Sequence, residues 1–97
     1  MGADGHVMIY DLEKIKTELS DEEIKPLLNS MVYIQEMQGR KYLTLYYGDN
    51  LYFDGASWQD MMRTDYKEYD WYVTRDEWER RWGIIRKYLL AEWEVWT

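Results

Sequence analysis

Cysteine is absent from the chain, and proline and histidine occur only once each, as Pro26 and His6. Without cysteine the chain has no disulfide framework and no thiolate chemistry. One histidine cannot form a multi-histidine zinc site, and no motif supplies the partners that a catalytic histidine needs. The six glycines are scattered and form neither a phosphate-binding loop nor a dinucleotide fingerprint. These absences predict a protein that is not an enzyme and that holds no metal or cofactor.

Long apolar runs are also absent, and none approaches the roughly 18 residues of a membrane span. The first ten residues lack the basic start and the apolar core of a signal peptide. We therefore expect a cytoplasmic protein without membrane contact, which means the host cell cytoplasm if a phage encodes it. The 97 residues fit one domain, 1–97, in which residues 1–5 form a flexible start.

Acidic and aromatic residues are abundant instead. The net charge is −7, and the chain has six Trp, ten Tyr and one Phe. An acidic surface repels nucleic-acid phosphates but attracts a partner that has a basic groove. Tyr and Trp combine a large apolar area with a polar group and are enriched at protein interfaces. The composition therefore favours protein binding over direct nucleic-acid binding, and it is compatible with a homo-oligomer.

Short elements are predicted in the N-terminal third. The apolar run His6–Tyr10 predicts an edge strand, and Asp11 is suited to cap a following helix. Ser20–Glu23 has the capping-box pattern of a second helix, in which Ser20 and Glu23 satisfy free backbone N–H groups. Pro26 lies too late for a first helical turn, so this helix is expected to be short or kinked.

A period of two begins near residue 31 and continues to about residue 54. Apolar and polar positions alternate, and glycine-containing turns interrupt them at Gln38–Arg40 and Gly48–Asn50, before a last run at Leu51–Phe53. Such runs joined by short turns are typical of antiparallel strands. Residues 31–54 therefore predict a three-stranded antiparallel meander.

A long helix is predicted over residues 75–91. Thr74–Glu77 forms a second capping-box pattern, and apolar residues follow at helical spacing at Trp78, Trp82, Ile85 and Leu89. Before this helix, Ser57–Met62 predicts a short helix and Trp71–Val73 a strand, and after Ala91 a C-terminal strand follows. The expected fold class is α+β, with the meander and the C-terminal strand packed against the long helix.

The acidity is concentrated in two parts of the chain. Residues 1–39 sum to −5, residues 40–48 to +2, residues 49–72 to −4, and residues 73–97 to zero. Residues 49–72, here called the acidic aromatic segment, also carry rigid aromatic side chains of the kind that anchor binding loops. The predicted partner-binding residues are Asp49, Asp54, Trp58, Asp65, Tyr66, Glu68, Tyr69, Asp70 and Trp71.

The acidity and aromatic content of this segment predict that the chain is a small acidic binding protein that acts as an inhibitor. Carboxylates can replace phosphates in a basic groove, and aromatic rings can replace bases, so the segment would act as a nucleic-acid mimic. We expect a phage-type, anti-defence inhibitor that occupies a basic, nucleic-acid-binding surface of a host defence protein.

Two local resemblances give alternatives. Leu89–Val95 resembles the ending of a family of phage proteins that sequester nucleotide signals of the Thoeris defence, and Tyr42–Leu45 is similar to that family's hairpin. The basic, Trp-containing N-terminal motif of that family is missing here, so no binding role is transferred. Tyr46–Leu51 resembles a segment of barstar, an acidic ribonuclease inhibitor, which implies an antitoxin or immunity protein. In barstar a helix follows this segment at once, whereas here Phe53–Gly55 intervenes.

Overall fold

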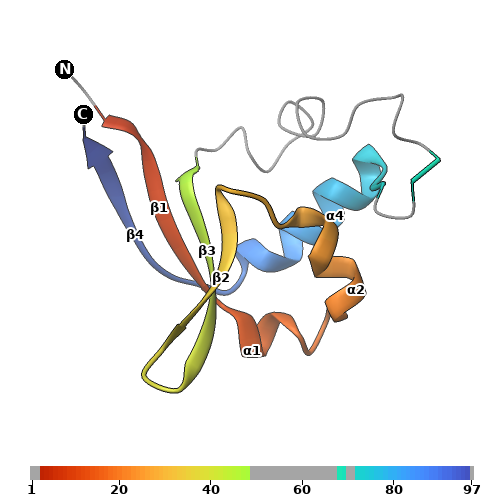
Figure 1. The fold of residues 1–97 in the computed structure, drawn as a ribbon, viewed down its shortest axis with the longest axis horizontal. Coiled ribbons are helices and arrows are strands. Elements are labelled where there is room, and N and C mark those ends of the chain that lie inside the picture. Colours follow the sequence, from red (N-terminus) through yellow and green to blue (C-terminus); the bar gives the residue numbers. More distant parts are fainter. Residues whose placement is uncertain (1–2, 49–67, 70–71, 97) are drawn as a thin grey trace.

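The computed structural model describes residues 3–48, 68–69 and 72–96, with side chains for residues 7–46, 68–69 and 72–92. A four-stranded sheet and several short helices make up this part of the chain (Figure 1). The α+β class is therefore confirmed. The elements in chain order are β1 (Ala3–Asp11), α1 (Leu12–Ile15), α2 (Asp21–Ile24), the 3-10 helix η1 (Lys25–Leu27), β2 (Val32–Met37), β3 (Arg40–Gly48), α4 (Arg75–Arg86) and β4 (Leu89–Trp96).

The strands lie in the order β2-β3-β1-β4, and every neighbouring pair is antiparallel. The edge-strand prediction for His6–Tyr10 is wrong, because these residues belong to β1, which lies between β3 and β4. Val7, Met8 and Tyr10 are all buried, so neighbouring residues of β1 are covered on both faces of the sheet. A continuous apolar run is typical of such an interior strand. β1 and β4 run side by side from the Ala3–Trp96 pair to the Tyr10–Leu89 pair (Figure 1).

The first two strands of the predicted meander are confirmed as β2 and β3. Gln38 and Gly39 join them with φ angles of 53° and 79°, the left-handed conformation that two-residue hairpin turns require. Glycine adopts such an angle without steric cost. On its other side β3 pairs with β1. The third predicted strand, Leu51–Phe53, lies outside the described residues.

Side-chain hydrogen bonds cap the N-termini of α1 and α2, as predicted. The Asp11 carboxylate accepts a hydrogen bond from the Lys14 backbone N–H at 3.3 Å. The Ser20 hydroxyl accepts from the Glu23 N–H at 3.2 Å, and the Glu23 carboxylate accepts from the Ser20 N–H at 3.0 Å. This reciprocal pair is a complete capping box. α2 ends before Pro26, which lies in η1, so the expectation of a short helix is confirmed.

The long helix predicted over residues 75–91 is wrong in its extent. α4 ends at Arg86, and the chain re-enters the sheet as β4, where Leu89 pairs with Tyr10 of β1. The backbone hydrogen bonds of β4 to β1 therefore replace the last helical turns that the sequence pattern indicated. The C-terminal strand predicted after Ala91 is confirmed, and it begins two residues earlier than Ala91.

The second predicted capping box is only half formed. The Thr74 hydroxyl accepts from the Glu77 backbone N–H at 3.3 Å, so Thr74 caps α4 as expected. The Glu77 carboxylate is instead bound by Arg80 and Arg81, one turn further along the helix. Two charge-assisted hydrogen-bond partners are stronger than one neutral backbone N–H, which explains the difference.

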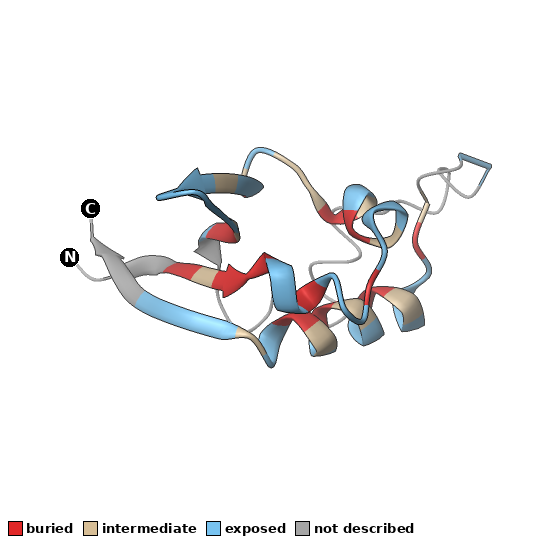
Figure 2. Cartoon of the chain, turned by 90° about the horizontal axis from the view of Figure 1, so that it is seen from below, coloured by how far each residue is buried: buried red, intermediate tan, exposed pale blue. Residues whose placement is uncertain are grey.

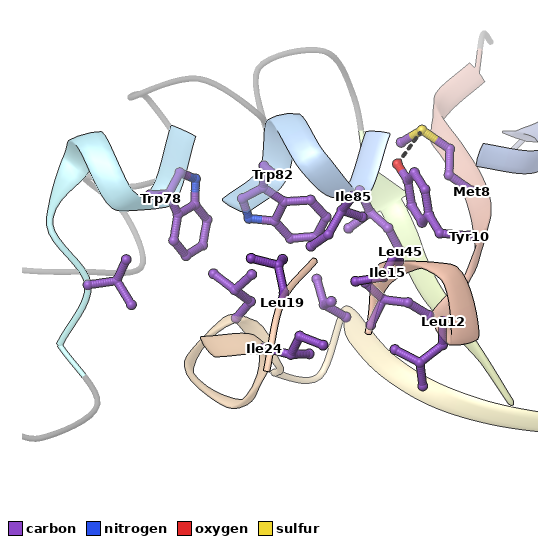
Figure 3. Packing of buried hydrophobic residues seen from close by; sticks show 14 residues of the cluster. Met8, Tyr10, Leu12, Ile15, Leu19, Ile24, Leu45, Trp78, Trp82 and Ile85 are labelled. Atoms are coloured by element: carbon purple, nitrogen blue, oxygen red, sulfur yellow. Dashed lines mark hydrogen bonds between the residues drawn. The ribbon is translucent and has the colours of Figure 1, made fainter. Parts of the chain in front are cut away.

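The core lies between the helices and one face of the sheet, where the buried segments gather (Figure 2). Trp78, Trp82 and Ile85 of α4 point into it, as their helical spacing predicted (Figure 3). The ring of Trp82 lies 6.5 Å from that of Tyr10. Leu89 does not continue this stripe, because it lies in β4 and is 43 % exposed. The buried cluster comprises Met8, Tyr10, Leu12, Ile15, Leu19, Ile24, Leu27, Val32, Leu43, Leu45, Val73, Trp78, Trp82 and Ile85.

The chain between β3 and α4 is described only in part. The strand predicted at Trp71–Val73 is not formed at Tyr72 and Val73, which lie in irregular structure ahead of the Thr74 cap. Val73 is buried in the core, so its apolar character serves packing rather than sheet pairing. The helix predicted at Ser57–Met62 lies outside the described residues.

Candidate functional site

Two of the predicted partner-binding residues lie in the described part of the chain. Glu68 and Tyr69 are both exposed, and Tyr69, at 55 %, is the most exposed large hydrophobic side chain that the structure describes. The Tyr72 backbone N–H donates to the Tyr69 carbonyl at 3.0 Å and closes a turn here. The other predicted residues lie outside the described part: Asp49, Asp54, Trp58, Asp65, Tyr66, Asp70 and Trp71.

Many acids of the N-terminal third form ion pairs with nearby bases. The Lys16 ammonium lies 3.3 Å from the Asp21 carboxylate. Arg40 of β3 lies 3.2 Å from Asp11 and also 3.2 Å from Glu13. Asp11 is almost completely buried, so Arg40 supplies the positive charge that a buried carboxylate requires. These ion pairs neutralise part of the local negative charge.

A second group of ion pairs joins α2 to α4. The Arg80 guanidinium lies 2.6 Å from the Glu23 carboxylate and 2.9 Å from that of Glu77. Arg81 donates to the Glu23 backbone carbonyl at 3.0 Å and to the Glu77 carboxylate at 3.0 Å. The hydrogen bond from the Ser20 backbone, followed by that from Arg80, lowers the pKa of Glu23. The hydrogen bond from Arg80 is the main cause of the lowered pKa of Glu77.

A third group lies where the α1 region meets the C-terminal end of α4. The Lys87 ammonium donates to the Glu18 carboxylate at 2.8 Å, and the Tyr88 hydroxyl donates to its other oxygen. These two hydrogen bonds, that from Lys87 first, lower the pKa of Glu18. The same contact with Glu18 raises the pKa of Tyr88. The group links two parts of the chain that are distant in sequence.

Ion pairs join acids of the N-terminal third to bases elsewhere in the described chain, and the formal charge is unevenly distributed along the sequence. Acids of the N-terminal third are bound by bases of β3 and α4, and residues 1–48 sum to only −3. Residues 73–97 sum to zero. The acidic aromatic segment, residues 49–72, carries −4 in a much shorter stretch of sequence. The largest density of net negative charge therefore belongs to this segment.

The lowered pKa values predict that acid weakens the fold. Glu18, Glu23 and Glu77 have pKa values below the ordinary 4.5 in the folded chain, so their carboxylates stabilise it above that pH. This stabilisation is lost as the pH falls from about 4.5 through the lowered values. Urea midpoints measured between about pH 6 and pH 3 should fall steadily below about pH 4.5.

The matched control for this pH dependence is a pair of single substitutions. Glu18→Gln should remove part of the acid-dependent decline, because it removes a titrating group that Lys87 and Tyr88 bind. Glu22→Gln should leave the decline unchanged, because Glu22 is exposed and forms no ion pair within the described residues. Equal pH profiles for all three proteins would contradict the assignment.

Aromatic side chains lie on the sheet face that is turned away from the helices. Tyr33 of β2 is opposite Thr44 of β3, and Tyr42 is opposite Gln35, so these residues share that face. Tyr33 and Tyr46 are each 38 % exposed. None of these aromatic residues was among the predicted partner-binding residues. The signal was present, since Tyr42, Thr44 and Tyr46 alternate with buried leucines in a period of two.

A shallow hollow lies on the helix side of the sheet beside β2, with a volume of about 260 Å³. Its lining surface is mainly apolar, and Ile34 of β2, one of its lining residues, is 43 % exposed. Lys16 and Lys25 are among its lining residues, and Lys25 forms no ion pair within the described residues. The lining residues are Lys16, Asp21, Ile24, Lys25, Leu28 and Ile34.

Comparisons with protein-family models, curated proteins and solved structures found no significant match. Among the described residues, no three His, Cys, Asp or Glu side chains gather as a metal site would require. No helix in that part of the chain is long and apolar enough to cross a membrane. Nucleotide sequestration and an antitoxin role, which rest on local resemblances, stay predictions.

Proposed function

We propose that this chain is a non-enzymatic binding protein and that its acidic aromatic segment occupies a basic surface of a partner protein. The surface in question normally holds nucleic acid, so the chain inhibits its partner by competition. A phage-type inhibitor of a host defence protein is the biological role that suits these properties.

The distribution of charge is the observation that carries this proposal. Arg40, Arg80 and Lys87 bind acids of the N-terminal third, so those acids are engaged within the fold. By sequence, the remaining concentration of negative charge is the segment of residues 49–72, at −4. A concentrated charge steers association with an oppositely charged groove and gives the encounter a strong dependence on salt.

The described part of the segment supports the same assignment. Tyr69 presents 55 % of its side chain at the surface, and the adjacent Glu68 is exposed as well. An exposed aromatic ring beside a carboxylate offers both groups that a nucleic-acid groove recognises, a stacking surface and a negative charge. Trp78 and Trp82 are buried, so the aromatic residues of α4 serve the core instead.

A capture experiment followed by competition tests this function. The chain is immobilised and exposed to a bacterial lysate at low salt, and each captured protein is identified and purified. We expect a basic nucleic-acid-binding protein whose complex with labelled DNA or RNA is displaced by the free chain. We also expect the displacement to weaken at high salt, because screening reduces the attraction between the charges. Failure to recover a protein that competes with nucleic acid would overturn the proposal.

Two triple substitutions with the same change in net charge locate the binding surface. Asp65→Asn/Glu68→Gln/Asp70→Asn should weaken the interaction by about tenfold or more, because these acids meet the basic groove. Glu13→Gln/Glu22→Gln/Asp76→Asn neutralises three acids outside the segment and should change the affinity by about twofold at most. Equal losses in the two triples would show that total charge, rather than the segment, governs binding.

A further inference from the structure

The strand β2 is an unusually apolar edge of the sheet. Three of the seven exposed large hydrophobic side chains among the described residues lie on this one strand, namely Tyr33, Ile34 and Met37. Natural proteins protect edge strands with lysine, proline, bulges or covering loops, because an open edge pairs with other strands. β2 has no lysine and no proline, and its only charged residue is Glu36. The strand therefore has the character of an association surface.

The backbone of β2 offers a short free stretch of hydrogen-bonding groups. Met31 accepts from the Tyr46 backbone N–H, which places the odd-numbered residues of β2 in hydrogen-bonded pairs with β3. The even-numbered residues consequently direct their N–H and C=O groups away from β3. The groups of Val32 are already paired, because the Asn29 backbone N–H donates to the Val32 carbonyl and the Val32 N–H donates to the Asn29 carbonyl. Among the described residues, the stretch that remains open for pairing runs from Ile34 to Glu36.

We propose that β2 pairs with β2 of a second copy of this chain, antiparallel and about a two-fold axis at Gln35. In this register Ile34 of each copy exchanges both backbone hydrogen bonds with Glu36 of the other. The two sheets then form one continuous antiparallel sheet across the interface. Such a symmetric contact closes on itself, as most homodimer interfaces do.

The apolar side chains of β2 are self-complementary in this register. On the sheet face turned away from the helices, Tyr33 of each copy lies opposite Met37 of the other, with the two Gln35 side chains between them. Tyr33 is 38 % exposed and Met37 is 36 % exposed in the single chain. Opposed side chains on neighbouring strands stabilise a sheet, and the Met thioether packs favourably on an aromatic ring.

Charge complementarity on the helix side favours a second copy as the occupant. There, Glu36 of the second copy lies next to Ile34, at the hollow that Lys25 lines together with the Lys16–Asp21 ion pair. Glu36 and Lys25 each form no ion pair within the described residues. The pairing brings these two charges together twice, once on each side of the axis. A partially covered site makes such an ion pair stronger than one in open solvent.

The other edge strand of the described sheet is β4, whose exposed residues include Glu92. In the proposed pairing of β2, no two like charges lie directly opposite one another, an arrangement that would be destabilising. The β2 edge also lies outside residues 49–72, so the dimer goes beyond the proposed function and does not depend on it.

Sedimentation equilibrium over a range of concentrations tests the dimer directly. The full chain should change from its monomer mass of 12.0 kDa to twice that value as the concentration rises. Glu36→Lys should weaken dimerisation by about tenfold or more, since it places a lysine against Lys25 of the second copy. The double variant Lys25→Glu/Glu36→Lys should restore dimerisation to within about threefold, because the pair is then reversed. Lost folding alone would not be rescued in this way.

A matched control lies on the opposite edge of the sheet. Leu90 of β4 is 53 % exposed, and Leu90→Lys should leave dimerisation unchanged. Circular dichroism and thermal unfolding of each variant confirm that the fold is kept. A chain that stays monomeric at concentrations up to about 1 mM would overturn the proposal. A dimer that tolerates Glu36→Lys but is lost in Leu90→Lys would overturn it as well, because the interface would then be β4.

Discussion

Replacing Trp82 by alanine is expected to lower the free energy of unfolding by about 3–5 kcal/mol, the largest effect of any single substitution considered. Trp82 is fully buried, and its ring contacts those of Tyr10 in β1 and Trp78 in α4, at 6.5 Å and 6.1 Å between centroids. The substitution leaves a large cavity between helix and sheet, and it removes two aromatic contacts. A domain of this size has a total stability of about 5–15 kcal/mol, so the variant should be only marginally folded.

Leu89→Ala is the matched control for this prediction. The apolar spacing of the sequence places Leu89 in the same stripe as Trp82, whereas the structure places it in β4 with 43 % exposure. Its replacement should therefore cost less than about 1.5 kcal/mol, because little cavity is formed. Urea denaturation of both variants against the unchanged chain measures the two losses. A loss below about 1 kcal/mol for Trp82→Ala would show that this stripe is not core.

Local signals in the sequence predicted the beginnings of helices correctly. Asp11, Ser20 and Thr74 each accept a backbone hydrogen bond within the next three residues, and such an interaction depends on neighbouring residues alone. The end of α4 could not be predicted in the same way. It depends on the pairing of Leu89 with Tyr10, two residues that are far apart in the sequence. The helical pattern and the strand pattern overlap at this point, and the sheet contact decides between them.

The sequence gives the net charge of each region, but it does not show which acids form ion pairs. The tally of −5 over residues 1–39 gives no sign that Arg80 binds Glu23 or that Lys87 binds Glu18, since these partners are more than fifty residues apart. The structure shows these ion pairs, which the sums over the sequence could not reveal. The apolar edge of β2 could not be predicted either, because it depends on contacts between distant parts of the chain. Alternation predicts a strand but does not say which strand ends the sheet.

Asp11 has two structural roles, and Asp11→Ala is therefore expected to cost about 2–3 kcal/mol. Its carboxylate caps α1 by accepting from the Lys14 N–H, and it also binds the Arg40 guanidinium at 3.2 Å. Loss of the cap alone typically costs about 1 kcal/mol. Loss of the ion pair adds to this, because Asp11 is 4 % exposed and solvent screens its charge only weakly. Urea denaturation measures the effect, with an unchanged m-value if both states keep their compactness.

Two further substitutions separate these two roles of the Asp11 carboxylate. Asp11→Asn keeps an oxygen that can accept from the Lys14 N–H but removes the negative charge, so its cost should be about half that of Asp11→Ala. Glu13→Gln removes the other carboxylate that binds Arg40, at an exposed site, and should cost less than about 0.5 kcal/mol. If Asp11→Asn were as costly as Asp11→Ala, the ion pair rather than the helix cap would dominate. If Asp11→Ala and Asp11→Asn both left the urea midpoint unchanged, the contacts that Asp11 makes with α1 and β3 would contribute nothing to the stability of the fold.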